Sequence, residues 1–137
     1  MSLDKPHYKV VAAAIFEGDS VYCFKKGKSK YSYSSYKFEF PGGKIIPGET
    51  QQQALIREIK EELKVLVEVK NIITTVNHSY PDFSLDMTCF KCLKKNGSFI
   101  LNEHLEVVLK NIQKLDTLEW LDADIPIVKK IMSSYGK

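Results

Sequence analysis

Three glutamates and an arginine crowd one face of a helix predicted over residues 50–64. Glu58 lies three residues before Glu61 and four before Glu62, and residues at these spacings are neighbours on a helix surface. Like charges so placed destabilise an isolated helix by roughly 0.2–0.5 kcal/mol per pair. Arg57, four residues before Glu61, offsets part of this repulsion. Such a cluster is either a solvated charged face or a set of metal ligands.

Two glycines ahead of this helix favour metal ligands. Gly42 and Gly43 allow the backbone to approach a ligand where a Cβ atom would obstruct it, and Glu49 stands just before the helix. Magnesium prefers hard oxygen ligands, commonly a few carboxylates with water and substrate phosphates. Three helix carboxylates and a nearby backbone carbonyl would supply them. The repulsion that destabilises the metal-free helix would then favour binding of a divalent cation.

The same residues resemble the signature of the Nudix family. It is present here as Gly43-x5-Glu49-x7-Arg57-Glu58-Ile59-x-Glu61-Glu62-x-x-Val65, in which eight of nine defined positions match across 23 residues. Lys64 replaces the last glycine, which ends the helix in a left-handed conformation in the family. A residue with a side chain costs ~1–2 kcal/mol in that conformation. We therefore expect Lys64 to affect stability more than chemistry.

The resemblance implies a Mg²⁺ site, with Mn²⁺ as a possible substitute. Arg57 and Glu49 are implied to pair and orient the motif, a role that suits a guanidinium fork and that lysine cannot fill. Glu58 is implied to be the general base or to orient the attacking water, although the family does not place the base uniformly. The implied metal ligands are Glu58, Glu61, Glu62, Glu103 and the carbonyl of Gly42. For Glu103 the alternative is an exposed loop carboxylate.

Further segments look like the MutT-type branch of this family and its CTP-pyrophosphohydrolase-like members. They are residues 38–44, 80–83, 103–104 and 120–128. The resemblance implies an α+β fold, an α/β/α sandwich around a central mixed β-sheet. It also implies hydrolysis of a nucleoside diphosphate linked to a further group, here a nucleoside triphosphate such as CTP, dCTP or 8-oxo-dGTP. The products would be a nucleoside monophosphate and pyrophosphate.

Candidate substrate contacts fall on both sides of the motif. Lys25 and Lys26 close a predicted strand where MutT-type members keep basic residues, and lysine binds phosphate as a point charge; the alternative is a solvated strand end. Gly43 and Lys44 are expected beside the substrate as well. Tyr80 stands where an aromatic ring stacks on the base, or else covers the core.

Acidic residues near the C-terminus are candidates for reading the base. Asp122 and Asp124 could accept hydrogen bonds from cytosine N4 or from guanine N–H groups, and Asp124 could instead cap a helix. His78 and His104 are candidate proton donors, although a lone histidine is more often structural. Phe83 stands where MutT itself has a basic residue, so the pocket is not a copy of that enzyme's.

Composition is ordinary for a soluble domain. The chain has 137 residues, 44% of them apolar, and a net charge of +3, which fits one domain spanning 1–137. The longest apolar run, residues 10–16, is far short of the ~20 residues of a membrane helix, and no secretory signal is visible. The three cysteines predict reduced thiols and a cytoplasmic location, with Cys89 and Cys92 on opposite faces of one strand.

The predicted elements alternate between strands and helices. A capping box formed by Thr50 and Gln53 predicts the start of the acidic helix, and buried residues at 55, 59 and 63 mark its apolar stripe. Asn96-Gly97 predicts a hairpin turn. The remaining expectations are strands at 10–16, 21–24, 83–93 and 106–109, one or two strands in 65–76, a long loop at 25–37, an extended segment 38–40 broken at 41–43, a short extended piece at 44–46, and a last helix opening at 124–126.

Three functions compete for this sequence. The first is a nucleoside triphosphate pyrophosphohydrolase acting on a small-molecule nucleotide, and the second is a hydrolase of another nucleoside diphosphate derivative. The third is a binding module, because residues 25–37 interleave lysines and tyrosines as single-strand nucleic-acid binders do. The intact carboxylate set favours the enzyme, which needs neither nucleic acid nor membrane. The sequence leaves open whether it is a monomer or a dimer.

Overall fold

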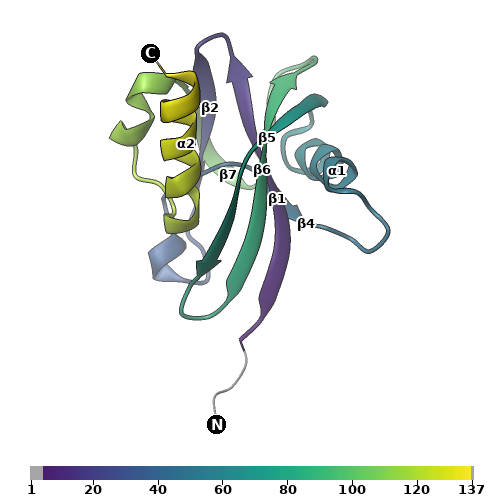
Figure 1. The fold of residues 1–137 in the computed structure, drawn as a ribbon, viewed down its shortest axis with the longest axis vertical. Helices are drawn as coiled ribbons and strands as arrows, with labels where there is room; N and C mark the ends of the chain where they lie inside the picture. The colour runs from purple at the N-terminus through teal and green to yellow at the C-terminus, as the bar shows by residue number, and fades with distance from the viewer. Residues whose placement is uncertain (1–4, 137) are drawn as a thin grey trace.

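A computed structural model describes residues 5–136. One mixed sheet lies between two helices, with α1 (Gln51–Leu63) on one face and α2 (Ile125–Tyr135) on the other (Figure 1). This is the predicted α+β sandwich. Short 3₁₀ turns span Ser32–Ser34, Ile112–Thr117 and Asp122–Asp124. The strands are β1 (His7–Glu17), β2 (Ser20–Lys26), β3 (Phe38–Glu39), β4 (Gly42–Lys44), β5 (Val67–Ser79), β6 (Ser84–Lys94) and β7 (His104–Asn111).

The sheet splits beside its central strand. Its order is β3-β2-β1-β6-β5, with β7 paired to β2 and β4 paired to β1. β1 runs parallel to β6 along ten residue pairs, but it pairs with β2 only at Phe16–Val21 and Glu17–Ser20. Nearer the start of β1, β4 takes the place of β2 and pairs with Val10–Ala12. The divergence of β1 from β2 brings the glycine pair against the middle of the sheet.

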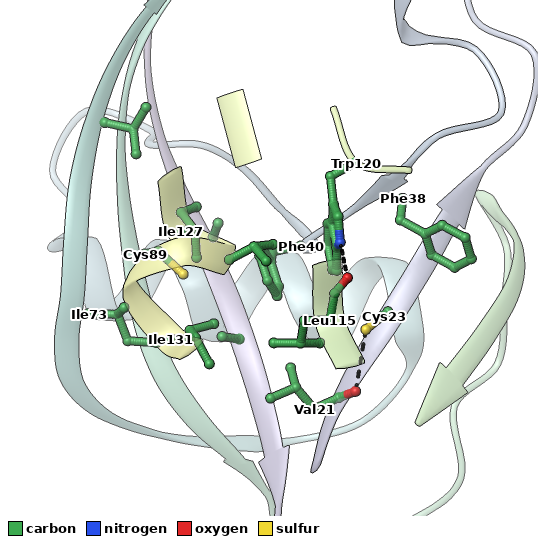
Figure 2. Packing of buried hydrophobic residues seen from close by; sticks show 14 of the residues in the cluster. Val21, Cys23, Phe38, Phe40, Ile73, Cys89, Leu115, Trp120, Ile127 and Ile131 are labelled. Carbon is green, nitrogen blue, oxygen red and sulfur yellow. Dashed lines mark hydrogen bonds between the residues drawn. The ribbon is translucent and has the colours of Figure 1, made fainter. Parts of the chain in front are cut away.

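Both faces of β1 are buried, which explains its long apolar run. Ala12, Ala14 and Phe16 belong to the core beneath α2, whereas Val11, Ala13 and Ile15 belong to the core beneath α1. Figure 2 shows the cluster on the α2 side, where Trp120 Nε1 donates to the Leu115 carbonyl at 2.8 Å.

The cysteines behave as predicted. Cys89 lies in the α2-side core and Cys92 in the α1-side core, so the two thiols do face opposite sides of β6. Cys23, Cys89 and Cys92 are all buried and free. Among residues 5–136, no helix is long and apolar enough to cross a bilayer.

The acidic helix is fixed at both ends and along one stripe. The predicted capping box is present, since Gln53 N donates to Thr50 Oγ1 at 3.1 Å and Thr50 N donates to Gln53 Oε1 at 2.9 Å. Leu55, Ile59 and Leu63 are fully buried, as the four-residue spacing predicts. The capping box and the buried stripe fix the orientation of α1 about its axis. They therefore also fix the direction in which its glutamates point.

Several local predictions were wrong. The predicted break at 41–43 is right only in part, because β3 does end at Glu39 but Gly42–Lys44 forms a new strand, β4, against β1. Asn96-Gly97 forms no hairpin, because β6 and β7 do not pair and β7 instead joins β2. Asp124 stands at the N-cap of α2, but its side chain makes no capping hydrogen bond. Which strands pair in a buried sheet depends on residues far apart in the sequence. Local turn signals carry no information about those residues.

Lys64 keeps the left-handed conformation that the motif normally gives to glycine. Its φ and ψ are 60° and 31°, and its N–H donates to the Lys60 carbonyl. We predict that Lys64→Gly raises the free energy of unfolding by about 1 kcal/mol, since glycine lacks the Cβ clash of this conformation. Urea denaturation measures the change. Lys64→Ala is the control and should gain nothing; a Lys64→Gly protein no more stable than wild type would refute the strain.

Candidate functional site

Arg57 is the centre of the acidic motif. Its Nε and one Nη2 hydrogen donate to the two oxygens of Glu49, at 2.7 and 2.9 Å. Nη1 donates to Glu58 at 2.9 Å and to Glu61 at 3.2 Å. The other Nη2 hydrogen goes to the Lys44 carbonyl at 3.0 Å. All five guanidinium donors thus have acceptors, and the bidentate contact with Glu49 is the one expected from the sequence.

The charges in this network support one another. The Arg57 guanidinium, followed by the Ile46 N–H, holds the pKa of Glu49 below its ordinary value. Glu49 in turn raises the pKa of Arg57. Glu49 also accepts from the Ile46 N–H at 3.0 Å, so the carboxylate ties the loop between β4 and α1 to the helix. The network fixes where the motif helix sits relative to the glycine strand.

Neither glycine of β4 can carry a side chain. A Cβ at Gly43 would lie 2.4 Å from Glu58 Oε2, and a Cβ at Gly42 would lie 1.9 Å from the Val11 carbonyl oxygen. The first clash would push away the Glu58 carboxylate, and the second would separate β4 from β1. The Glu58 carboxylate therefore packs directly on the backbone of Gly43.

Behind Glu58, the half-buried Glu62 lies beside Glu103, which is exposed. Burial, then a hydrogen bond and repulsion from Glu103, and then repulsion from Glu39 and Glu58, raise the pKa of Glu62 to about 9. Glu62 Oε2 is buried without a hydrogen-bond partner. Glu103 therefore lies close enough to Glu62 to raise its pKa, while its role as a metal ligand stays a prediction.

This donor set fits a divalent cation. Glu103, Glu39 and Glu58 repel the Glu62 carboxylate, and Glu62 Oε2 is buried without a hydrogen-bond partner. Carboxylate oxygens are the hard ligands that Mg²⁺ prefers. Within residues 5–136, no three acidic, histidine or cysteine side chains already surround one point as ligands. Glu58 and Glu61 face Arg57 instead.

Glu39 is a further acidic residue of the site that was not predicted from the sequence. Its Oε2 lies 2.9 Å from His104 Nε2, and it acts on the pKa of both Glu62 and Asp124. The signal was present, because an acid between two buried aromatic residues, Phe38 and Phe40, must face the other side of the strand. His104 is buried and packs against Phe24, with 5.4 Å between the ring centroids. This packing holds the His104 ring beside the Glu39 carboxylate.

A cavity of about 380 Å³ opens beside the motif, where β1 and β2 diverge. Gly42, Gly43 and Glu39 line its acidic side. Aromatic and apolar residues line another part of the wall, and a buried acid closes it. These further lining residues include Lys26, Tyr80, Phe83, Leu85, Met87 and Asp124. The cavity is apolar with a few polar groups, as small-molecule sites usually are.

The surroundings of Asp124 change how this residue could hydrogen-bond to a nucleobase. Only 3% of the residue is exposed, and burial, followed by repulsion from Glu39, raises its pKa well above the ordinary value. Burial thus favours the protonated form of Asp124, which can donate one hydrogen bond and accept another. The sequence alone predicted only an acceptor at this position.

Other predicted contacts lie away from the cavity wall. Lys25 Nζ sits 6.0 Å from the Phe38 ring centroid and Lys44 Nζ 4.1 Å from that of Tyr8, while Asp122 is exposed. None of the three lines the cavity, so their substrate roles stay predictions. His78 packs edge-on against Tyr80, with 4.4 Å between ring centroids.

Comparison with known proteins identifies the family. The family model described as NUDIX domain matches residues 5–128. The chain belongs to the Nudix family. Its CTP pyrophosphohydrolase relative from Escherichia coli K12 is 26% identical over 123 residues, 90% of each chain. An 8-oxo-dGTP diphosphatase from Proteus vulgaris is 42% identical over 53 residues, and one from E. coli K12 is 31% identical over 72. The matched segments span about half of these two diphosphatases, 47% and 56%.

Solved structures of Nudix proteins share the fold. The protein described as DNA mismatch repair protein MutT of the Nudix hydrolase family, from methicillin-resistant Staphylococcus aureus 252, is 36% identical with a TM-score of 0.74, covering 95% of this chain and 98% of that one. MutT protein from Methanosarcina mazei Go1 has a TM-score of 0.82 at 22% identity, covering 99% and 100%. These likenesses confirm the predicted Nudix fold.

Glu62 should give this Nudix domain an unusual pH dependence when divalent cations are removed. The folded carboxyl ionises near pH 9 and the unfolded one near its ordinary 4.5, so the folded state binds more protons between these values. Its contribution to stability is fully present below pH 4.5 and is lost as pH rises toward 9. We predict that Glu62→Gln flattens the fall in unfolding free energy between about pH 5 and pH 8, measured by urea denaturation in EDTA.

The matched control is Glu68→Gln, because Glu68 is an exposed carboxylate paired only with Lys70 on β5. It should leave the pH profile as in the wild type. Parallel profiles for wild type and Glu62→Gln would contradict the protonated state of Glu62.

Proposed function

We propose that the chain is a Mg²⁺-dependent nucleoside triphosphate pyrophosphohydrolase, with Mn²⁺ as a substitute. It would cleave a nucleotide such as CTP, dCTP or 8-oxo-dGTP to a nucleoside monophosphate and pyrophosphate. One observation carries the proposal. The Glu58 carboxylate packs on Gly43 at the side of a nucleotide-sized cavity that also contains the buried acid Asp124. Phosphate chemistry and base recognition would thus meet in one space.

The relatives agree with this substrate class. The CTP pyrophosphohydrolase aligns with 90% of the chain, and the partial matches are named 8-oxo-dGTP diphosphatases. Nudix hydrolases generally need a divalent metal. The side chains that would hold it here are Glu58, Glu61, Glu62 and Glu103, together with the Gly42 carbonyl. A divalent cation bound there would neutralise triphosphate charge and make a water molecule more acidic.

The chain's own residues would position the water and the phosphates. Glu58, oriented by Arg57 and backed by Gly43, would accept a proton from the attacking water. The water oxygen would form a new bond to a phosphorus atom of the triphosphate, and the anhydride P–O bond in line with it would break, separating the nucleoside monophosphate from pyrophosphate. Lys26, which lines the cavity, would hold phosphate oxygens as a point charge.

The base would occupy the far part of the cavity. Tyr80 is buried there and its hydroxyl accepts from the Ala123 N–H at 2.9 Å, which leaves the ring as its contribution to the wall. Asp124 in its acid form would pair with a base edge that presents both a donor and an acceptor, as cytosine and guanine do. The three buried free thiols suit a reducing compartment, and we place the enzyme in the cytoplasm.

Glu58→Gln should lower turnover by at least about 100-fold, the usual contribution of a general base, while leaving the fold intact. The assay follows monophosphate and pyrophosphate release with Mg²⁺ from 8-oxo-dGTP, CTP and 5-methyl-dCTP. Glu119→Gln, at an exposed position outside the cavity, should retain full turnover. Near-wild-type hydrolysis by Glu58→Gln would refute its role, and no hydrolysis of any of the three substrates by the wild type would count against the proposed activity.

A further inference from the structure

The loop of residues 27–37, hereafter the tyrosine loop, is an ordered part of the cavity wall. Its base is closed by two backbone hydrogen bonds, Lys26 N to the Lys37 carbonyl at 2.9 Å and Tyr36 N to the Gly27 carbonyl at 3.3 Å. Inside it, Ser29 Oγ donates to the Tyr31 carbonyl at 2.8 Å. This network gives the loop a defined shape, although the sequence predicted only an irregular segment.

Three tyrosines form a continuous stack that joins this loop to the core. The rings of Tyr31 and Tyr33 are nearly parallel, 8° apart with centroids separated by 5.3 Å. Tyr33 stacks in turn on Tyr80, at 18° and 5.4 Å. Tyr80 is only 6% exposed and belongs to the α2-side core. The outer ring, Tyr31, is therefore supported from behind by two others.

A hydrogen bond latches the stack to the turn between β5 and β6. Tyr33 Oη donates to Asp82 Oδ2 at 3.0 Å, and the turn is itself closed by Tyr80 N donating to the Phe83 carbonyl at 2.8 Å. In Figure 1 the short helix of the tyrosine loop lies beside this turn, at the lower end of the sheet. The latch thus joins two segments 49 residues apart in the sequence.

The position of each ring indicates its role. Tyr31, Tyr80 and Phe83 all line the cavity, whereas Tyr33 does not. Tyr31 and Phe83 lie 5.9 Å apart, centroid to centroid, so the loop and the turn together present an aromatic wall. Tyr31 is partly exposed, while Tyr80 is buried. Of the two cavity-lining tyrosines, Tyr31 therefore offers the more accessible surface.

We propose that Tyr31 contacts the nucleotide base by stacking, and that Tyr33, held by Asp82, positions Tyr31. The proposal rests on the proposed function, because it requires a base in this cavity. Aromatic rings stack on bases with little dependence on base identity, since every base has a π face. The alternation of lysine and tyrosine in this loop, which resembles single-strand binding, would then serve one nucleotide.

Tyr31→Ala should raise KM for the nucleoside triphosphate about 10-fold, within the range that aromatic-to-alanine changes cost in base stacking. kcat should stay within about 2-fold, because the glutamates and Arg57 are untouched. Tyr31→Phe keeps the ring and should restore the wild-type KM. The control is Tyr36→Ala, a tyrosine of the same loop that is 54% exposed and outside the cavity; its KM should not change.

The positioning role of Tyr33 is tested by a double-mutant cycle. Tyr33→Phe keeps the stack but removes the donor, and Asp82→Ala removes the acceptor. Each should raise KM about 3-fold, a typical effect of losing one hydrogen bond, and the double variant should show the same 3-fold rise. Independent effects that multiply to about 9-fold would overturn the latch, as would a KM unchanged in both single variants.

A binding assay separates failure of the stacking from failure of the proposed activity. By isothermal titration calorimetry, Tyr31→Ala should weaken binding of a nucleoside monophosphate about 10-fold relative to wild type and leave ribose 5-phosphate binding unchanged. Equal weakening of both ligands, or of neither, overturns the role of Tyr31. If the wild type binds the monophosphate but hydrolyses no triphosphate, only the proposed activity fails. If the wild type hydrolyses a triphosphate but Tyr31→Ala leaves its KM unchanged, only the stacking fails.

Discussion

A single guanidinium group holds the acidic site together. The chain has 19 lysines and one arginine, and that arginine uses all five of its donors on three carboxylates and one backbone carbonyl. Hydrogen bonds to charged groups contribute about 1.5–3 kcal/mol each, and lysine could not reproduce the planar fork. Without Arg57, Glu58 would lose its hydrogen-bond partner and Glu49 would keep only the Ile46 N–H. The loop after β4 and the first turns of α1 would lose their common anchor.

The glycine strand imposes the matching steric constraint. β4 approaches β1 so closely that a single added carbon at Gly42 would overlap the Val11 carbonyl, and one at Gly43 would overlap Glu58. This close approach depends in turn on the divergence of β1 from β2, which gives β4 its place in the sheet. The same divergence opens the cavity. Backbone pairing, acidic cluster and binding space are therefore consequences of one split in the sheet.

Features that depend on nearby residues could be predicted from the sequence. The capping box at Thr50, the buried stripe of α1 and the opposite orientations of Cys89 and Cys92 follow from periods of a few residues. The pair Arg57–Glu49 was implied by the resemblance to the Nudix signature. The resemblance to the Nudix signature then supplied the fold.

Features that depend on distant residues could not be predicted. The pairing of β7 with β2, rather than with β6, joins residues 78 to 91 positions apart, and a local Asn-Gly signal suggested a hairpin instead. His104 meets Glu39 across 65 positions. The stack of tyrosines joins a loop to a turn 49 positions away. For Asp124 the sequence left open base reading and helix capping, and it gave no sign that burial inside a cavity raises the pKa of this carboxyl.

Anomalous diffraction from crystals soaked in Mn²⁺ would test the acidic site most directly. A manganese ion ligated by oxygens of Glu58, Glu61 or Glu62, together with the Gly42 carbonyl, is the predicted result. Crystals in which these carboxylates keep their contacts with Arg57 and no manganese lies beside them would contradict it.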